Sequence, residues 1–263
     1  MRPLCELGAD EARRLRGLLF DLDDTLLSHG VLTRAAYAAL WSLRDAGLAL
    51  VGVTGRPSGW GEVLVRQWPI DGCVTENGAV HVTREGRGVM RVDSCDEAER
   101  RERASRLARL VARVREVIPD AKLSDDQHAR VSDVTWDIGE LVTLPPDRVR
   151  LVAREIALAG ARSMQSSVHL HATFDVDDKA SGAIRFCQRR LGEDPGAAVV
   201  RFAFAGDSGN DAACFAAFRT TFGVANVRSS LPFLSVTPRY VAAREMGEGF
   251  AEIAAQILAS RAG

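Results

Sequence analysis

The stretch Phe20–Leu26, with the sequence FDLDDTL, is the most informative part of this 263-residue chain. It follows the apolar residues 18–20, which predict a short buried strand. Residues two apart in an extended backbone point to the same side, so Asp21 and Asp23 can converge. Burying like charges together is costly unless a cation or a reacting group compensates them. The pair therefore indicates a divalent-cation site that offers a nucleophile and a proton carrier, although turn residues or a helix cap would fit the same pattern.

A second group of polar residues directly follows the apolar strand predicted for residues 48–53. Thr54, Gly55 and Arg56 lie there, just before a helix predicted to begin near Pro57. A hydroxyl and exposed backbone N–H groups at the start of a helix suit an oxyanion of phosphate. An ordinary strand–turn–helix junction is the alternative.

Two segments in the C-terminal half carry further charged side chains. Lys179 is one of two lysines among 34 basic residues, and an ammonium can contact a carboxylate and a phosphate together, although a simple helix-start charge is also possible. An apolar run over residues 199–205 predicts a strand that ends near Asp207. Asp211 lies four residues later, one turn into the next predicted helix, with Asn210 beside it. These hard oxygen donors suit Mg²⁺ rather than zinc.

The four segments, in this order, resemble the motifs of the haloacid dehalogenase-like (HAD) superfamily of phosphotransferases. The stretches that carry the resemblance read DLDDTL, TGR, DK and GDSGND. Residues 75–79, TENGA, are similar to a turn of the Cof-type branch, which includes sucrose-phosphate and mannosyl-3-phosphoglycerate phosphatases. The resemblance spans about residues 17–250, and Ala180 departs from it because Gly usually follows the lysine.

The resemblance implies a Mg²⁺-dependent phosphomonoesterase with an aspartyl-phosphate intermediate. Asp21 would be the nucleophile, and Asp23 the acid and base that protonates the leaving alcohol and then activates water. Phosphate would be bound by Thr54, Gly55 and Lys179, with support from Arg56 and Asn210. The implied metal ligands are Asp21, Asp23 through its backbone carbonyl, Asp207 and Asp211.

The alternation of apolar strands and amphipathic helices predicts an α/β fold with a doubly wound, Rossmann-like parallel sheet covered on both faces. We expect residues 17–82 and 178–263 to form this catalytic core and residues 1–16 to be an N-terminal extension. Asp21, Thr54 and Asp207 all follow predicted strands, and open α/β sheets bind ligands at the carboxyl ends of their strands. The motifs and the architecture therefore place the site at the same edge.

Residues 83–177 interrupt the alternation and are predicted to form an inserted α/β cap, as in type IIB members of the superfamily. Predicted helices at 96–118 and 146–159 alternate with extended stretches at 129–138 and 166–174. A cap excludes water and contacts the part of the substrate that is not phosphate. The candidate substrate-binding residues, each with a structural role as the alternative, are Glu76, Asn77, Arg130, Ser167 and His169. His169 and His171 share a face, but a metal site there lacks a third ligand.

The composition of the chain limits the classes of binding partner that we expect. The net charge of −1 gives no strong field that would attract nucleic acid or a membrane, and no apolar run approaches the roughly 18 residues of a membrane span. Five scattered cysteines without zinc spacing and the lack of a signal-peptide pattern lead us to expect a cytoplasmic protein. The expected partner is a small phosphate ester, which the resemblance suggests is a sugar phosphate or a phosphoglycerate glycoside. A phosphosugar mutase and a non-catalytic sensor are the alternatives, and the oligomeric state stays open.

Overall fold

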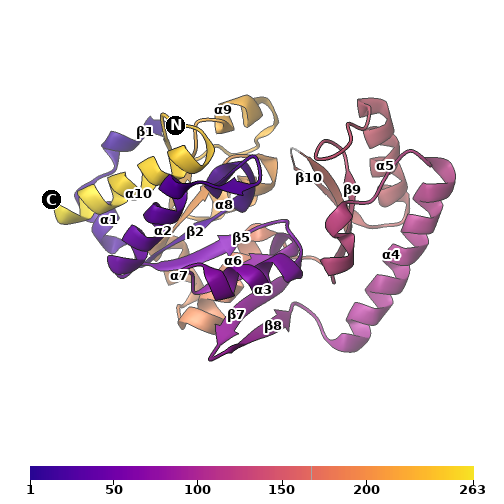
Figure 1. Cartoon of the computed structure of the whole chain (residues 1–263), viewed down its shortest axis with the longest axis horizontal. Helices are drawn as coiled ribbons and strands as arrows, with labels where there is room; N and C mark the ends of the chain where they lie inside the picture. Colours follow the sequence, from indigo (N-terminus) through magenta and orange to yellow (C-terminus); the bar gives the residue numbers. More distant parts are fainter. Residues whose placement is uncertain (167) are drawn as a thin grey trace.

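In the computed structural model, which describes residues 1–166 and 168–263, nine of the described strands form one large sheet (Figure 1). Neighbouring strands pair in parallel from β1 to β6, and β7 and β8 are antiparallel. The order across the sheet is β1 (Arg2–Pro3), β14 (Tyr240–Val241), β13 (Thr220–Gly223), β12 (Phe202–Gly206), β2 (Gly17–Phe20), β5 (Ala49–Val53), β6 (Gly72–Thr75), β7 (Val80–Glu85) and β8 (Gly88–Asp93).

Helices cover both faces of this sheet because its central strands are apolar on both sides. In β2, Leu18 and Phe20 belong to one buried cluster and Leu19 to the other, as the two-residue period of a strand requires. The first cluster is covered by α1 (Ala9–Arg14), α2 (Arg34–Asp45), α3 (Ser58–Gln67) and α10 (Met246–Ala262). The second is covered by α6 (Lys179–Leu191), α7 (Pro195–Arg201), α8 (Ala212–Ala217) and α9 (Val227–Ser230). The predicted Rossmann-like α/β fold is confirmed.

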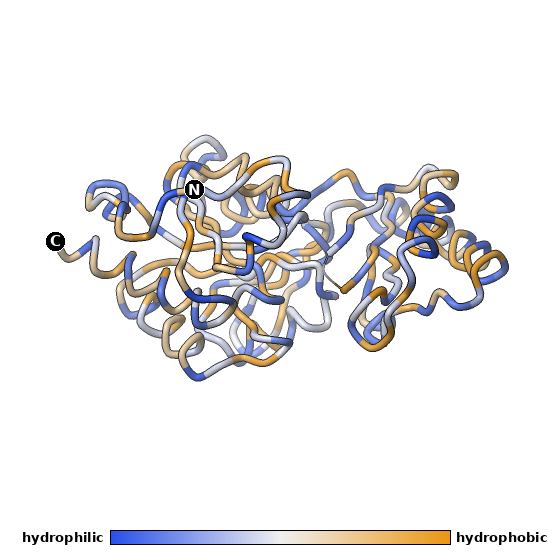
Figure 2. Tube along the Cα trace, turned by 90° about the horizontal axis from the view of Figure 1, so that it is seen from above, coloured by the Kyte–Doolittle hydropathy of each residue, from blue (hydrophilic) through white to orange (hydrophobic). Residues whose placement is uncertain are grey.

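The second lobe, here called the cap, runs from α4 (Glu97–Val117) to β11 (His169–Thr173). It contains an antiparallel sheet in the order β10 (Arg162–Gln165), β11 and β9 (Asp133–Asp137). Helices α4 and α5 (Pro146–Leu158) pack on this sheet around a separate apolar core that includes Trp136. Apolar stretches therefore run through both lobes (Figure 2). Among the described residues, no helix combines the length and the hydrophobicity needed to cross a membrane.

The structure differs from the expected boundaries in three places. The boundary at residue 83 falls inside β7, and β8 continues the large sheet rather than the cap. Residues 1–16 are integrated into the core, since β1 pairs with β14 and Leu4 is buried. Residues 199–201 are the end of α7 rather than a strand, because the Asp194 side chain caps a helix that begins at Pro195.

The Glu76 carboxylate joins the cap to the core. It lies in a helical turn (Glu76–Gly78) after β6 and is almost fully buried. It accepts hydrogen bonds from the Ser58 backbone N–H of the core at 3.0 Å and from the Val131 N–H of the cap at 3.1 Å. The backbone N–H and the hydroxyl of Ser132 both donate to it at 2.6 Å. The predicted substrate-binding residue Glu76 therefore has its acceptor capacity used by structural hydrogen bonds.

We predict that Glu76→Gln lowers the free energy of unfolding by about 2–4 kcal/mol, because an amide NH₂ would then face N–H donors that need an acceptor. Urea denaturation measures the change. The control is Glu97→Gln, which removes an exposed i,i+4 ion pair with Arg101 and should change stability by less than about 0.5 kcal/mol. Equal effects in the two variants would contradict the structural role.

His81 in β7 is a buried histidine that the fold holds neutral. Its Nε2 lies 2.9 Å from the carbonyl oxygen of Gly182 in α6, and its ring packs edge-on against Phe186. Burial, with Arg185 nearby, lowers the pKa of His81 to about 4. In the unfolded chain His81 is protonated below about pH 6.5, whereas in the folded protein it is protonated only below about pH 4. The free energy of unfolding therefore falls as the pH drops from about 6.5 to about 4.

We predict that His81 accounts for a loss of about 2 kcal/mol in the free energy of unfolding between pH 7 and pH 5. Urea titrations at the two pH values should show a steeper decline in the wild type than in His81→Gln, which has no group titrating at this position. Parallel pH profiles for the two proteins would show that His81 is not the source.

Candidate active site

Three adjacent parallel strands bring distant polar residues to one edge of the large sheet. β12, β2 and β5 are neighbours, and Asp207, Asp21 and Thr54 follow them directly. The Asp21 N–H donates to the Ala205 carbonyl at 2.9 Å, and the Thr54 N–H donates to the Val74 carbonyl at 2.8 Å. The backbone hydrogen bonds between neighbouring strands therefore extend to the first residue after β2 and after β5. Asp207, Asp21 and Thr54 therefore lie at the carboxyl ends of neighbouring strands, as the sequence pattern predicted.

Lys179 lies between two of the acidic side chains. Its Nζ donates to Asp21 Oδ1 at 2.6 Å and to Asp211 Oδ1 at 2.7 Å, and the side chain is almost fully buried. Although burial alone would lower the pKa of Lys179, Asp21 and Asp211 raise it well above its ordinary value. The ammonium is therefore a fixed positive charge of the site.

Backbone packing fixes the start of α6 and with it Lys179. The side chain of Asp178 caps the helix by accepting the Ser181 N–H at 2.8 Å. A Cβ atom on Gly182 would lie 2.4 Å from the Cα of Gly78, and one on Gly78 would lie 2.1 Å from the Asp178 carbonyl oxygen. Glycine is therefore required where the turn meets the helix, at residues 78 and 182, whereas Ala180 packs into the apolar core.

Asp21, Asp207 and Asp211 form a buried acidic cluster, with carboxylate oxygens within 4.8 Å of one another. Asp211 Oδ2 accepts the backbone N–H groups of Asp207 at 2.9 Å and Ser208 at 3.1 Å. Asp207 accepts the Thr25 hydroxyl at 3.2 Å. Burial, reinforced by the neighbouring carboxylates, raises the pKa values of Asp21 and Asp207 well above the ordinary range.

The donor set of this cluster fits a divalent cation. Lys179 contacts two of the three buried carboxylates, so the cluster with all three ionised would carry more negative charge than Lys179 neutralises. Oxygen-only ligands favour Mg²⁺ over softer metals. Asp21, Asp207 and Asp211 are the side chains that could hold such an ion.

The Asp23 carboxylate points to Arg56 rather than to the cluster. Arg56 Nε and Nη2 donate to its two oxygens at 2.9 Å each, in a bidentate pair. Arg56 Nη2 also donates to Glu140 of the cap at 2.8 Å. Arg56 therefore connects the proposed proton carrier of the core with the cap.

Thr54 and Gly55 form the loop that the sequence assigns to phosphate. The Thr54 hydroxyl accepts the Arg56 N–H at 3.0 Å and stays buried. A Cβ atom on Gly55 would lie 3.2 Å from the amide of Asn77, so the loop passes close to the Glu76–Gly78 turn. The Arg130 guanidinium of the cap donates to the Gly55 carbonyl at 2.9 Å. Gly55 is therefore contacted from both lobes.

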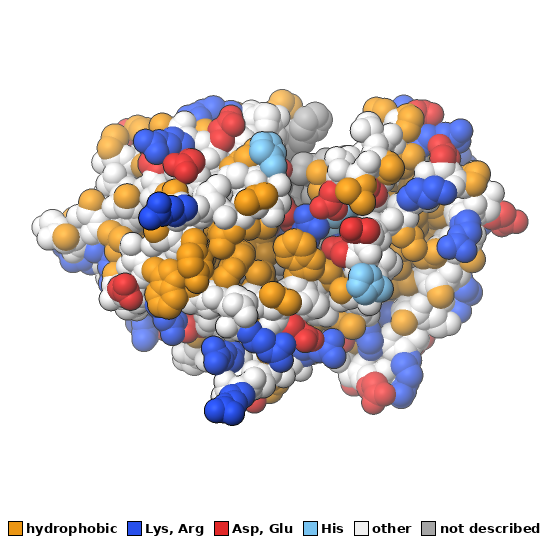
Figure 3. All heavy atoms as spheres, viewed as in Figure 1, with side chains coloured by type: hydrophobic (Ala, Val, Ile, Leu, Met, Phe, Trp, Pro, Cys, Tyr) orange, Lys and Arg blue, Asp and Glu red, His pale blue; other side chains and the backbone are white. Residues whose placement is uncertain are grey.

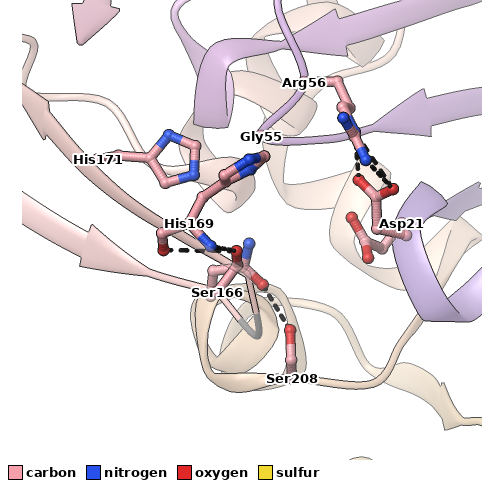
Figure 4. Close-up of a pocket in the computed structure, with 9 residues that line it drawn as sticks. Asp21, Gly55, Arg56, Ser166, His169, His171 and Ser208 are labelled. Atoms are coloured by element: carbon pink, nitrogen blue, oxygen red, sulfur yellow. Dashed lines mark hydrogen bonds and ion pairs between the residues drawn. The ribbon is translucent and has the colours of Figure 1, made fainter. Parts of the chain in front are cut away.

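A small inner cavity of about 20 Å³ lies between the two lobes beside Asp21 and is lined further by Gly55, Arg56, His169, His171 and Ser208 (Figure 4). In the close-up the two histidines of β11 lie beside Gly55, and a Cβ atom on Gly55 would lie 3.4 Å from His171 Cε1. His171 Nδ1 lies 2.9 Å from Asp133, and His169 Nε2 lies 2.7 Å from Glu140. Burial lowers the pKa values of both histidines. His171 is thus hydrogen-bonded to a carboxylate, whereas His169 Nε2 lies close to one without the geometry of a hydrogen bond. Among the described residues, neither histidine belongs to a group of three metal-ligating side chains.

The remaining predicted residues have mixed outcomes. Arg130 is buried among Asp126, Asp133 and the Gly55 carbonyl, so it fixes the interface rather than lining the cavity. Asn77 is buried, and its amide has no hydrogen-bond partner among the described residues. Asn210 lines the inner cavity and its Oδ1 accepts the Ser208 hydroxyl at 2.9 Å, and no hydrogen bond joins it to Lys179 in the part of the chain that the structure describes. Ser167 lies outside the described residues.

Sequence reasoning missed Asn226 and Glu140. Asn226 Nδ2 donates to Asp207 at 3.0 Å and to the Asp24 carbonyl at 2.9 Å. It follows β13, so the rule that located Asp207 could have found it. Glu140 lies in a cap loop, where no local pattern indicates its contact with Arg56.

No protein-family model matches the sequence, and a search of curated proteins finds no match. Solved structures do resemble this one. A protein from Thermoplasma acidophilum has a TM-score of 0.71 and 17% identity, over 93% of this chain and 98% of that one. Sucrose-phosphatase from Synechocystis sp., solved with sucrose and phosphate, has a TM-score of 0.65 and 17% identity, over 92% and 98%.

A phosphatase of the HAD superfamily from Bacteroides thetaiotaomicron has a TM-score of 0.62 and 18% identity, over 92% of this chain and 93% of that one. These alignments cover both lobes, because each includes more than nine-tenths of the chain. The chain therefore has the two-lobed fold of HAD-superfamily phosphatases, as its sequence motifs predicted.

Proposed function

We propose that the protein is a Mg²⁺-dependent phosphomonoesterase that works through an aspartyl-phosphate on Asp21. The observation that carries the proposal is the position of Lys179, which contacts Asp21 and Asp211 at once within an acidic cluster at the strand ends. A buried ammonium beside a carboxylate nucleophile prepares the site for a second anion, the phosphoryl group.

The chemistry follows from the groups present. An Asp21 oxygen attacks phosphorus while the bond to the alcohol oxygen breaks, and that oxygen takes a proton from Asp23. Water, deprotonated by Asp23, then attacks the aspartyl-phosphate and releases inorganic phosphate. The Thr54 hydroxyl, the Gly55 N–H and Lys179 bind the other phosphoryl oxygens. An acid at residue 23 favours ester cleavage over dehalogenation, because an alkoxide leaves poorly without a proton.

A bound Mg²⁺ would supply positive charge that screens the nucleophile from the phosphoryl oxygens. Asp21, Asp207, Asp211 and the Asp23 backbone carbonyl are the proposed ligands. Asp207 is oriented by Thr25 and Asn226, so these two residues would fix its carboxylate for that role.

The cap and the core would divide the substrate between them. We propose that the core, which includes β1, β7 and β8, binds the phosphoryl group and that the cap contacts the alcohol. Support comes from the inner cavity, whose lining includes Gly55 of the core and the two histidines of the cap. The similarity in fold to a sucrose-phosphatase supports a small phosphorylated metabolite, such as a sugar phosphate or a phosphoglycerate glycoside.

We predict that Asp21→Asn lowers phosphate release at least a thousandfold without unfolding the protein. An amide is a poor nucleophile, but it has the size of the carboxylate and can still accept the Lys179 hydrogen bond. The measurement is phosphate release from p-nitrophenyl phosphate and a panel of sugar phosphates, with Mg²⁺ or with EDTA. Circular dichroism checks the fold, and Asp10→Asn, at an exposed ion pair with Arg13, is the control.

Each alternative has a distinct outcome in the same assay. An Asp21→Asn variant with wild-type turnover would refute the nucleophile. Conversion of a hexose phosphate into its isomer without free phosphate would identify a mutase. Thermal stabilisation by sugar phosphates, with no turnover of any ester by the wild type, would identify a sensor.

A further inference from the structure

A groove on the cap, here called the α4–α5 groove, lies outside the candidate active site. Residues of α4 and α5 line it together with Phe174, and none of its lining residues lines the inner cavity beside Asp21. Its volume of about 400 Å³ falls within the roughly 300–1,000 Å³ of small-molecule sites. Basic side chains are exposed on the cap, the lobe on the right in Figure 3. The lining of the groove itself combines three arginines and one glutamate with apolar side chains.

Two of the three arginines in the groove have no carboxylate partner. Arg113 pairs with Glu155 of α5 at 3.2 Å. Arg109 donates to the Ser105 hydroxyl of its own helix at 2.9 Å. In the part of the chain that the structure describes, neither Arg106 nor Arg109 forms an ion pair with a carboxylate. The groove therefore has uncompensated positive charge at these two residues.

The Arg106 guanidinium is held in a fixed orientation. Its central carbon lies 3.6 Å from the centroid of the Phe174 ring, which is the geometry of a cation–π contact. Phe174 directly follows β11, and the next residue, Asp175, is buried and accepts a hydrogen bond from Arg100 of α4 at 2.7 Å. The position of the ring is therefore set by its neighbours, and Arg106 needs little ordering to receive a ligand.

The charges of the groove are separated along α4. Arg106 and Arg113 lie about 10 Å apart along the helix axis, at 1.5 Å of rise per residue. Because Glu155 pairs with Arg113, the end of the groove near Arg113 carries a carboxylate as well as a guanidinium. Leu110 is buried, whereas Leu158 of α5 is 69% exposed and has apolar surface free to cover a ligand. The groove therefore suits a molecule that is acidic at one end and apolar along its body.

We propose that the α4–α5 groove binds a small organic anion with one acidic head and an apolar body about two rings in size. Arg106 and Arg109 would hold the head, because guanidinium groups match the oxygens of phosphate, sulfonate or carboxylate. Leu110 and Leu158 would cover the body. The inference goes beyond the proposed phosphatase function and does not depend on it, since no ester is cleaved in the groove.

The test uses two fluorescent probes with the same aromatic body. One is 8-anilinonaphthalene-1-sulfonate, and the other is N-phenyl-1-naphthylamine, which lacks the sulfonate. In titrations of the wild type we expect saturable binding of the sulfonate with a Kd below about 1 mM, at least tenfold tighter than binding of the neutral amine. Neither probe contains a phosphate ester, so binding is measured without turnover.

The double variant Arg106→Ala/Arg109→Ala should weaken binding of the sulfonate about tenfold and leave binding of the neutral amine within about twofold, because only the charged head loses its partners. The matched control is Arg101→Ala/Arg115→Ala, which removes the same charge from α4 outside the groove. This control should leave binding of both probes within about twofold of the wild type.

A second variant tests the groove from α5. Leu158→Glu changes an exposed residue and places a carboxylate in the groove, so it should weaken binding of the sulfonate about tenfold by charge repulsion. Thermal unfolding checks that each variant is folded.

Three results would overturn the proposal. They are equal affinities of the wild type for the two probes, wild-type affinity for the sulfonate in the Arg106→Ala/Arg109→Ala variant, and an equal loss in the control variant. A wild type that dimerises in sedimentation, dissociates on Leu158→Glu and does not bind the sulfonate would also overturn it and would identify an interface between two copies of the chain. A protein that binds the sulfonate as expected but releases no phosphate from any ester would contradict the phosphatase proposal alone.

Discussion

The ammonium of Lys179, held between the carboxylates of Asp21 and Asp211, is the interaction on which the rest of the site depends. A buried charge is tolerated only when its partners are in place, and removing one partner of such a pair costs about 3–5 kcal/mol. The sheet order brings the ends of β2 and β12 together, and the glycine contact between residues 78 and 182 fixes the helix that carries the lysine. With its three carboxylates ionised, the acidic cluster would have excess negative charge, which is the physical reason for a cation there.

A second network of buried charges joins the two lobes. Arg56 connects Asp23 to Glu140, and the Glu76 carboxylate binds backbone N–H groups on both sides of the interface. An interface of charged and hydrogen-bonded groups gives one defined docked position, because any other position leaves buried groups unpaired. In this position the inner cavity has room for little more than a water molecule.

Local sequence patterns predicted the sheet core and the strand-end residues well, because the strands are short apolar runs bounded by clear turns. Local patterns gave wrong predictions where a residue's contacts lie far from it in the sequence. The half-exposed edge strand β8 has no clean alternation of apolar and polar residues, and the β-branched pair at 199–200 suggested a strand where Asp194 starts a helix. The cap contacts of Glu76 and Arg130 depend on how two lobes meet, which no local pattern contains.

In the proposed mechanism one ester and one cation meet at Asp21. A crystal structure grown with Mg²⁺ and orthovanadate, an analogue of the transferred phosphoryl group, tests it most directly. We expect vanadium bonded to an Asp21 carboxylate oxygen and in contact with Lys179, with a magnesium ion ligated by Asp21 and Asp207. Vanadate bound elsewhere, or a vanadate complex at Asp21 without a cation among these aspartates, would contradict it.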